Sequence, residues 1–160
     1  MPSESNDIIF FTPILTPLMG EPTHASLQLL QRELNANALQ IHSRCGGGLH
    51  GHLAQLISAK EYTLISETVF ILADEPGVQE PHALGATSAQ IFAANTFHNN
   101  TCDDFTTYCK TQVTLKSQLL AAVDDAFVNE LNDPLWSYGQ LTALQLLTHL
   151  RDTYGWITPD

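Results

Sequence analysis

Apolar residues recur at steps of three and four in three segments of the chain, as in a helix with one buried face. The segments are 23–41, the later half of 88–123, and the stretch that starts at Thr142. Their face-forming positions are Leu27, Leu30, Leu34, Ala38 and Ile41, then Phe105, Tyr108, Gln112, Leu115, Leu119 and Val123, then Leu144, Leu147, Leu150 or Arg151, and Tyr154. We therefore predict three main amphipathic helices.

Capping residues set the expected helix boundaries. Thr23 or Ser26 is a candidate N-cap of the first helix, because a hydroxyl oxygen there accepts a bond from a free backbone N–H. Capping boxes, in which a residue three positions later returns the bond, fit at Ser58 and Thr142. We predict a short helix from Ser58 to Ser66 and a final helix from Thr142.

The lack of helix breakers makes 88–123 the longest helical candidate. It contains no Gly or Pro, so it forms one long helix or two helices broken near 99–101. A further short helix is expected over 124–132, where Asp124 and Asp125 favour a helix start.

The segments between these helices are rich in proline and glycine. Residues 1–22 hold four prolines and predict an extended N-terminal arm. The glycines 46–48 predict a loop, and 74–85 predicts a linker. Two stretches remain open: 49–57 is a short strand or the start of a helix, and 69–72 is a buried apolar run of either type.

Together these elements predict an all-α bundle of five to six helices behind an extended proline-containing arm. The expected domains are the arm, 1–22, and a helical domain, 23–160, with 23–85 and 86–160 as optional sub-lobes. A chain of 160 residues is long enough to bury a real core.

Composition limits what the chain is expected to bind. Charged residues make up 14% of it, and six Lys and Arg against seventeen Asp and Glu leave a net charge of -11. Such a chain repels phosphate backbones and anionic lipid, so direct nucleic-acid binding is disfavoured. The apolar run 8–11 is cut off by prolines and follows no basic residue, so neither a secretory signal nor a membrane span is expected.

The cysteines favour a reducing compartment. Cys45, Cys102 and Cys109 are an odd number and lack the spacing of a disulfide framework. Cys102 and Cys109 stand two turns apart on one predicted helix and cannot bridge each other there. We therefore expect free thiols and a cytoplasmic protein.

Candidate metal ligands gather around the glycine loop. They are His42, Cys45, His50 and His52, which are imidazole and thiolate groups of the kind that complete a tetrahedral zinc site. Their spacing matches no recognised zinc motif, so we expect a loop without metal and keep this set as the alternative. No P-loop, nucleophile elbow or metalloprotease helix occurs in the sequence. We therefore expect neither a cofactor nor an enzyme.

Aromatic residues bracket the final predicted helix. Such a concentration is typical of a core latch or of an association surface, and both interpretations stay open. The residues that we assign to this latch or interface are Phe10, Phe11, Trp136, Tyr138, Leu147, Leu150, Tyr154 and Trp156.

Three segments resemble the Gag-like polyprotein of copia-type LTR retrotransposons. They are 23–38, the glycine and histidine stretch 46–53, and 141–155. The last carries the pattern Thr-Ala-x-x-x-Leu/Trp-x-x-Leu-x-x-x-Tyr-Gly of the family, at Thr142, Ala143, Leu147, Leu150, Tyr154 and Gly155. The resemblance spans about 23–160 and implies a capsid-like helical domain.

The resemblance also implies a function. Family members are structural proteins that self-associate into virus-like particles around the RNA of the element. The basic tail or zinc knuckle that many of them use for RNA does not occur in these 160 residues, so we expect RNA contact only through sequence not present here. The alternative is a domesticated or remnant helical adaptor that binds another protein without particle assembly.

Overall fold

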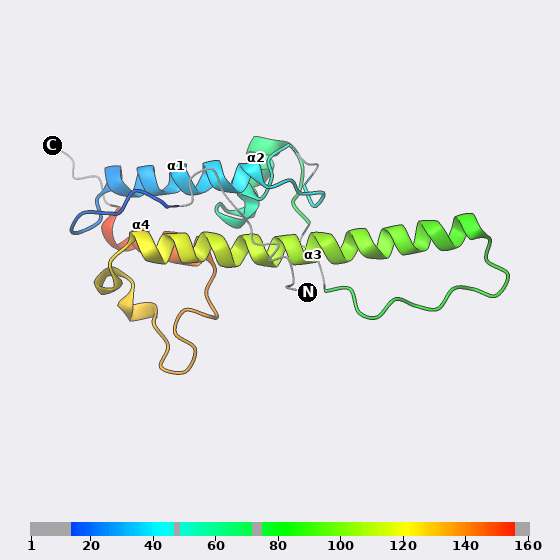
Figure 1. Cartoon of the computed structure of the whole chain (residues 1–160). Helices are drawn as coiled ribbons and strands as arrows, with labels where there is room; N and C mark the ends of the chain where they lie inside the picture. The colour runs from blue at the N-terminus through cyan, green and yellow to red at the C-terminus, as the bar shows by residue number, and fades with distance from the viewer. Residues whose placement is uncertain (1–13, 47–48, 72–74, 156–160) are drawn as a thin grey trace.

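The protein is all-α over the residues that the computed structural model describes, which are 14–46, 49–71 and 75–155. Those residues form four α-helices and no strand (Figure 1). The helices are α1 (His24–Gln40), α2 (Ala59–Ser66), α3 (Ser88–Ala122) and α4 (Ala143–Tyr154). Three 3-10 turns lie between them: η1 (Leu53–Gln55), η2 (Asp125–Phe127) and η3 (Asn129–Leu131).

The fold class is thus as predicted, whereas the helix count is lower than the predicted five to six. Residues 49–57 form neither a strand nor an α-helix, because Gly51 takes a φ of 50° and the chain then makes only the turn η1. Residues 124–132 form the two turns η2 and η3 in place of one helix. The side chain of Asp124 caps η2 by accepting a bond from Ala126 N.

The predicted caps place the helix starts correctly. Thr23 accepts a hydrogen bond from Ser26 N at 3.1 Å, and Thr142 accepts one from Gln145 N at 3.2 Å. Ser58 caps α2 in the same way, with Glu61 N as the donor. The capping box predicted there is incomplete, because the Glu61 side chain accepts a bond from the Ser58 hydroxyl and not from its backbone N–H. The capping box at Thr87, which begins α3, was not part of the prediction. Each cap satisfies a backbone N–H that has no partner within its helix.

Helix α3 is continuous over 35 residues, so the single long helix is the correct alternative and no break occurs near 99–101. At 1.5 Å per residue it is about 50 Å long, and it runs through most of the molecule in Figure 1. Neither α3 nor any other helix of the described residues is long and apolar enough to cross a membrane.

The main core lies where α1 and α4 pack against the C-terminal half of α3. A buried polar pair crosses it, in which Asn37 of α1 donates to the side chain of Gln118 of α3 at 3.0 Å. The core draws on both suggested sub-lobes, since α1 belongs to 23–85 and the other two helices to 86–160. Its fully buried leucines are Leu30, Leu34, Leu56, Leu115, Leu119, Leu146, Leu147 and Leu150.

A smaller cluster lies under α2 and contains Leu53, Ile57 and Tyr62, with Phe70 packed against them. The expectation of a buried apolar run at 69–72 is wrong for Val69 and Ile71, which are 67% and 70% exposed. No helix of the described residues covers them. Leu72 lies outside the described residues.

The described part of the N-terminal arm, 14–22, lies along the helices without a regular element of its own. Leu15 is buried in the main core, and Leu18 N donates to the carbonyl of Ala122 at 2.9 Å. Thr16 N donates to a carboxylate oxygen of Glu33 at 2.9 Å. The arm is therefore bonded to both α1 and α3.

Candidate functional site

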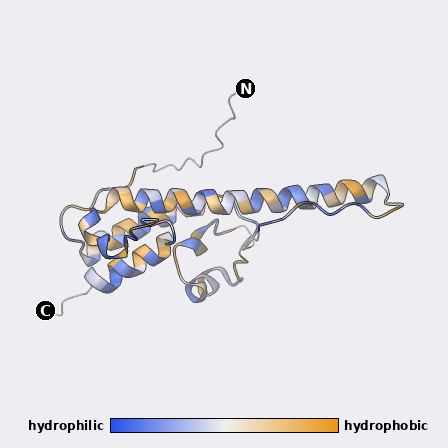
Figure 2. Cartoon of the chain, turned by 90° about the horizontal axis from the view of Figure 1, so that it is seen from below, coloured by the Kyte–Doolittle hydropathy of each residue, from blue (hydrophilic) through white to orange (hydrophobic). Residues whose placement is uncertain are grey.

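The first two thirds of α3 stand outside the main core. We call residues 88–110 the α3 extension, because the first buried residue of this helix is Thr111. Its outer part, 88–102, lies beyond the contacts that Asp104 makes with Arg44 and that Tyr108 makes with His52 and Phe70. Figures 1 and 2 show the extension running away from the packed helices, with the segment 75–87 along one side of it. A helix that is not covered by its own fold offers its free face to another molecule.

The free face of the extension carries two exposed aromatic rings. Phe92 is 73% exposed and Phe97 is 74% exposed. Five residues of helix turn the chain by about 140°, so the two rings lie at the two edges of this face. The exposed residues between them are small, with Ala89 and Ala93 among them. Small residues flanked by aromatic rings permit close approach of a second helix.

The extension is also free of charge over most of its length. Residues 88–102 contain no Asp, Glu, Lys or Arg, in a chain whose net charge is -11. The acidic pair Asp103 and Asp104 follows, and Arg44 forms an ion pair with Asp104 at 3.0 Å. The outer part of the extension is therefore an uncharged stretch on an acidic chain, so its own side chains add no repulsion between two copies.

The segment 75–87 and the extension form a shallow groove of about 680 Å³. Gln79 donates to the side chain of Asn95 at 2.8 Å and fixes the segment to the helix. His98 lines the groove, and its Nε2 lies 3.5 Å from the Sγ of Cys102. A cysteine nucleophile with a histidine base needs a third group that orients the histidine ring. Among the described residues no carboxylate or amide is bonded to the ring of His98.

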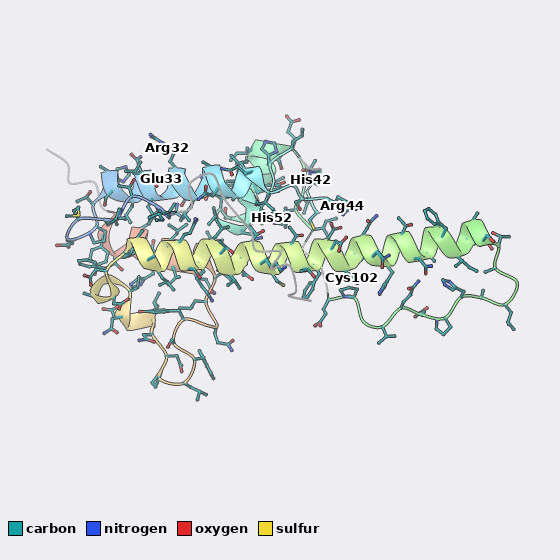
Figure 3. The ribbon with its side chains drawn as sticks, in the orientation of Figure 1. Arg32, Glu33, His42, Arg44, His52 and Cys102 are labelled. Carbon is teal, nitrogen blue, oxygen red and sulfur yellow. The ribbon has the colours of Figure 1, made fainter. Side chains whose placement is uncertain are left out.

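The structure separates the four candidate metal ligands into different environments. His52 is 1% exposed and its Nδ1 pairs with Gln55 Nε2 at 2.9 Å. His50 packs its ring edge-on against Tyr62, whereas His42 is exposed and Cys45 is half-buried. Figure 3 shows His42 and Arg44 near the end of α1. No three His, Cys, Asp or Glu side chains among the described residues are placed to hold a metal ion together.

Sequence reasoning missed the role of His52 as a core residue. Its ring lies among Phe70 and Tyr108, with centroid distances of 6.1 Å and 6.2 Å. Burial lowers the pKa of His52, and smaller opposing contributions come from the backbone of His42 and the carboxylate of Asp104. The neutral ring is therefore the form that the fold stabilises.

This histidine makes the stability of the fold depend on pH. In the unfolded chain His52 binds a proton below about pH 6.5, whereas the folded protein resists protonation to a lower pH. We expect the free energy of unfolding to fall as the pH drops below about 6.5, by at most about 1.4 kcal/mol per pH unit for this one proton. Urea unfolding at several pH values measures it.

Two variants separate the contribution of His52 from that of the other histidines. His52→Phe keeps an aromatic ring in the cluster and removes the titrating group, so its stability should change less between pH 7 and pH 5 than that of the wild type. His149→Gln removes a histidine of α4 outside the cluster, and it is the comparison for the loss of a histidine elsewhere in the fold. Equal pH dependence in His52→Phe and the wild type would contradict the assignment.

The residues of the aromatic latch or interface are divided between core and surface. Leu147 and Leu150 are buried in the main core, and Tyr138 and Tyr154 are half-buried and packed against it. Phe127 meets Tyr154 edge-on, with the ring centroids 5.4 Å apart. Trp136 alone of the described members is largely accessible, with 47% exposed. Phe10, Phe11 and Trp156 lie outside the described residues.

No protein-family model matches this chain, and no curated protein or solved structure matches it either. The similarity to copia-type Gag proteins therefore rests on the residues quoted for it, and it stays a prediction.

Proposed function

We propose that this chain is a structural subunit of the Gag-like capsid type, which self-associates through helix faces into dimers and larger particles. The α3 extension carries the proposal, because it is a long helix whose outward face is left uncovered by the rest of the described fold. The first contact in this proposal is between the extensions of two copies, packed side by side.

The composition of the extension supports pairing with a second copy. Phe92 and Phe97 supply apolar area, and each aromatic ring buried at an interface removes roughly 150–250 Å² from water. The stretch 88–102 adds no charge, so two copies meet there without direct repulsion between like side chains. Closed symmetric dimers are the commonest assemblies of identical chains, and a helix face that pairs with itself suits that symmetry.

Salt should strengthen this contact. Two chains of net charge -11 repel each other at long range, and 0.1 M salt limits that repulsion to about 10 Å. The contact itself is apolar and loses nothing to screening. We therefore expect the dimer to form at lower protein concentration as the ionic strength rises.

The substitution Phe92→Glu tests the proposal. It replaces one of the two aromatic rings of the contact face with a charge, so we expect the dissociation constant of the dimer to rise at least tenfold. Sedimentation velocity over a protein-concentration and salt series measures it. Val113→Glu is the matched control, because Val113 is an exposed apolar residue of the same helix outside the extension, 57% accessible.

A wild-type protein that stays monomeric at all concentrations and salt levels would contradict self-association. The adaptor interpretation would then take its place, with the same face of the extension as the contact for a helix of another protein. Equal weakening by Phe92→Glu and Val113→Glu would show that added charge, and not the extension, controls assembly.

A further inference from the structure

A second surface of the molecule is a groove between α1 and the end of α4. It has a volume of about 660 Å³ and is lined by apolar side chains, among them Leu27 and Leu39, and by polar ones. Leu39 is 44% exposed, on a face of α1 that is not packed into the core. The groove is large enough to take one or two protein side chains.

Two arginines lie on this groove, Arg32 from α1 and Arg151 from the last turn of α4. The chain has only six Lys and Arg in all. Arg44 is paired with Asp104, and Lys116 donates to the carbonyl of Tyr138. Neither groove arginine forms an ion pair with any residue in the described part of the chain. The groove is thus a positively charged, partly apolar site on an acidic protein.

A complementary feature lies in the loop between η3 and α4. Leu135 is 80% exposed and Trp136 is 47% exposed, so two large apolar side chains stand at the tip of this loop. The tip is held in shape, because Asp133 and Ser137 exchange two backbone hydrogen bonds at 2.8 Å and 2.9 Å. Asp133 also accepts a bond from Leu135 N at 2.7 Å.

Acidic residues surround this loop. Glu130 and Asp125 are exposed on the two turns that precede it, and Asp133 begins it. The loop tip therefore combines apolar side chains with negative charge, whereas the groove combines apolar walls with positive charge.

The loop and the groove lie on opposite sides of the molecule. Figure 3 shows Arg32 on the side of α1 that points away from α3, and Figure 1 shows the loop before α4 projecting beyond the other side of α3. The loop of one chain is therefore turned away from its own groove and is accessible to a second copy.

We propose that the Leu135–Trp136 loop of one copy inserts into the α1/α4 groove of the next copy, with Arg32 and Arg151 facing the acidic residues of the loop. Tryptophan and arginine are the residues most often found at the energetic centre of an interface. Because the two surfaces differ, the contact is head-to-tail and leaves a free loop at one end and a free groove at the other. Such contacts build rings or filaments, unlike a closed dimer.

This contact deepens the proposed self-association, since it names a second interface that lets dimers grow into larger particles. It also responds to salt in the opposite direction. Charged groups attract each other across the head-to-tail contact, so screening by salt weakens it. The contact between α3 extensions is apolar, so screening of the long-range repulsion strengthens it. Particles larger than a dimer should therefore decrease at high salt while the dimer remains.

A mixing experiment on the full chain tests the head-to-tail contact alone. All proteins carry Phe92→Glu, which removes the extension contact. One variant adds Trp136→Ser and keeps its groove, and the other adds Arg32→Glu and keeps its loop. Sedimentation velocity should show each variant as a monomer and the equal mixture as a one-to-one dimer. Lys60→Glu on α2 is the control for the charge change, because Lys60 is exposed and does not line the groove.

The outcomes are distinct for the two proposals. A mixture that stays monomeric, while the wild-type chain dimerises, overturns the head-to-tail contact and leaves the extension contact standing. If the mixed dimer forms but Phe92→Glu alone leaves the dissociation constant of the wild-type dimer unchanged, the extension contact only is overturned. If Arg32→Glu and Lys60→Glu weaken assembly of the Phe92→Glu chain equally, net charge is the cause and the groove has no role. Thermal unfolding of each variant shows that its fold is retained.

Discussion

Replacing Leu150 with Ala lowers the free energy of unfolding by about 2–5 kcal/mol, the range found when a buried leucine leaves a cavity. Leu150 is fully buried in the main core, on the face of α4 that packs against α1 and α3. Its neighbours come from several elements, so the surrounding helices cannot all move in to fill the space. Chemical denaturation measures the loss.

Leu64→Ala is the control for this substitution. Leu64 is a leucine of α2 with 74% of its surface exposed, so its removal should change stability by less than about 0.5 kcal/mol. If Leu150→Ala were equally mild but stopped assembly, this face of α4 would be an interface and not part of the core. Circular dichroism beside sedimentation would distinguish the two cases.

The second large effect is expected at Gly51. Its backbone has a φ of 50°, and a Cβ there would stand 2.6 Å from the carbonyl oxygen of Ala38 and 2.7 Å from that of Ile41. Ala38 lies in the last turn of α1, and Ile41 follows the helix. The backbone there is fixed, because His52, which follows Gly51, donates its N–H to the carbonyl of Ala38. Gly51→Ala therefore combines left-handed strain with a clash against backbone, and should cost about 2–4 kcal/mol.

Gly85→Ala separates the two causes. Gly85 also has a positive φ, 81°, but nothing lies within 4 Å of the position of its Cβ. This variant carries the strain alone and should lose about 1–2 kcal/mol. A loss at Gly51 no larger than that at Gly85 would show that the end of α1 moves aside to accept a side chain.

Local signals in the sequence predicted the helices well. The capping box at Thr142, the N-cap at Ser58 and the three-and-four spacing of leucines depend on residues within one turn of each other, and such patterns are readable without the fold. The absence of Gly and Pro likewise allowed one long helix at 88–122. Whether that helix would be interrupted depends on packing, so the sequence left both alternatives open.

Features that depend on distant residues were not predictable in this way. Asn37 and Gln118 are 81 positions apart, and nothing in the sequence marks them as partners. The burial of His52 arises from rings of Phe70 and Tyr108, which come from other parts of the chain. The apolar run at 69–72 was expected to be buried, because hydrophobicity alone does not tell whether another element covers a segment.

In the candidate site, too, features set by nearby residues were predicted and features set by distant residues were not. Trp136 was named from the sequence as a latch or interface residue, and it is accessible on its loop. The groove that faces the opposite side needs Arg32 and Arg151 together, two residues of different helices that no local pattern connects. The α3 extension was missed because helical periodicity does not reveal where the supporting core ends.

The continuity of α3 has a geometric consequence. One unbroken helix carries both the core residues Leu115 and Leu119 and the face of the extension. No glycine or proline separates the core residues from the extension. The extension is therefore rigidly connected to the core. Each residue added to the helix between them would rotate the extension by about 100° relative to the core and move it 1.5 Å farther away. In a particle built on paired extensions, the curvature of the shell would follow from the length of this one helix.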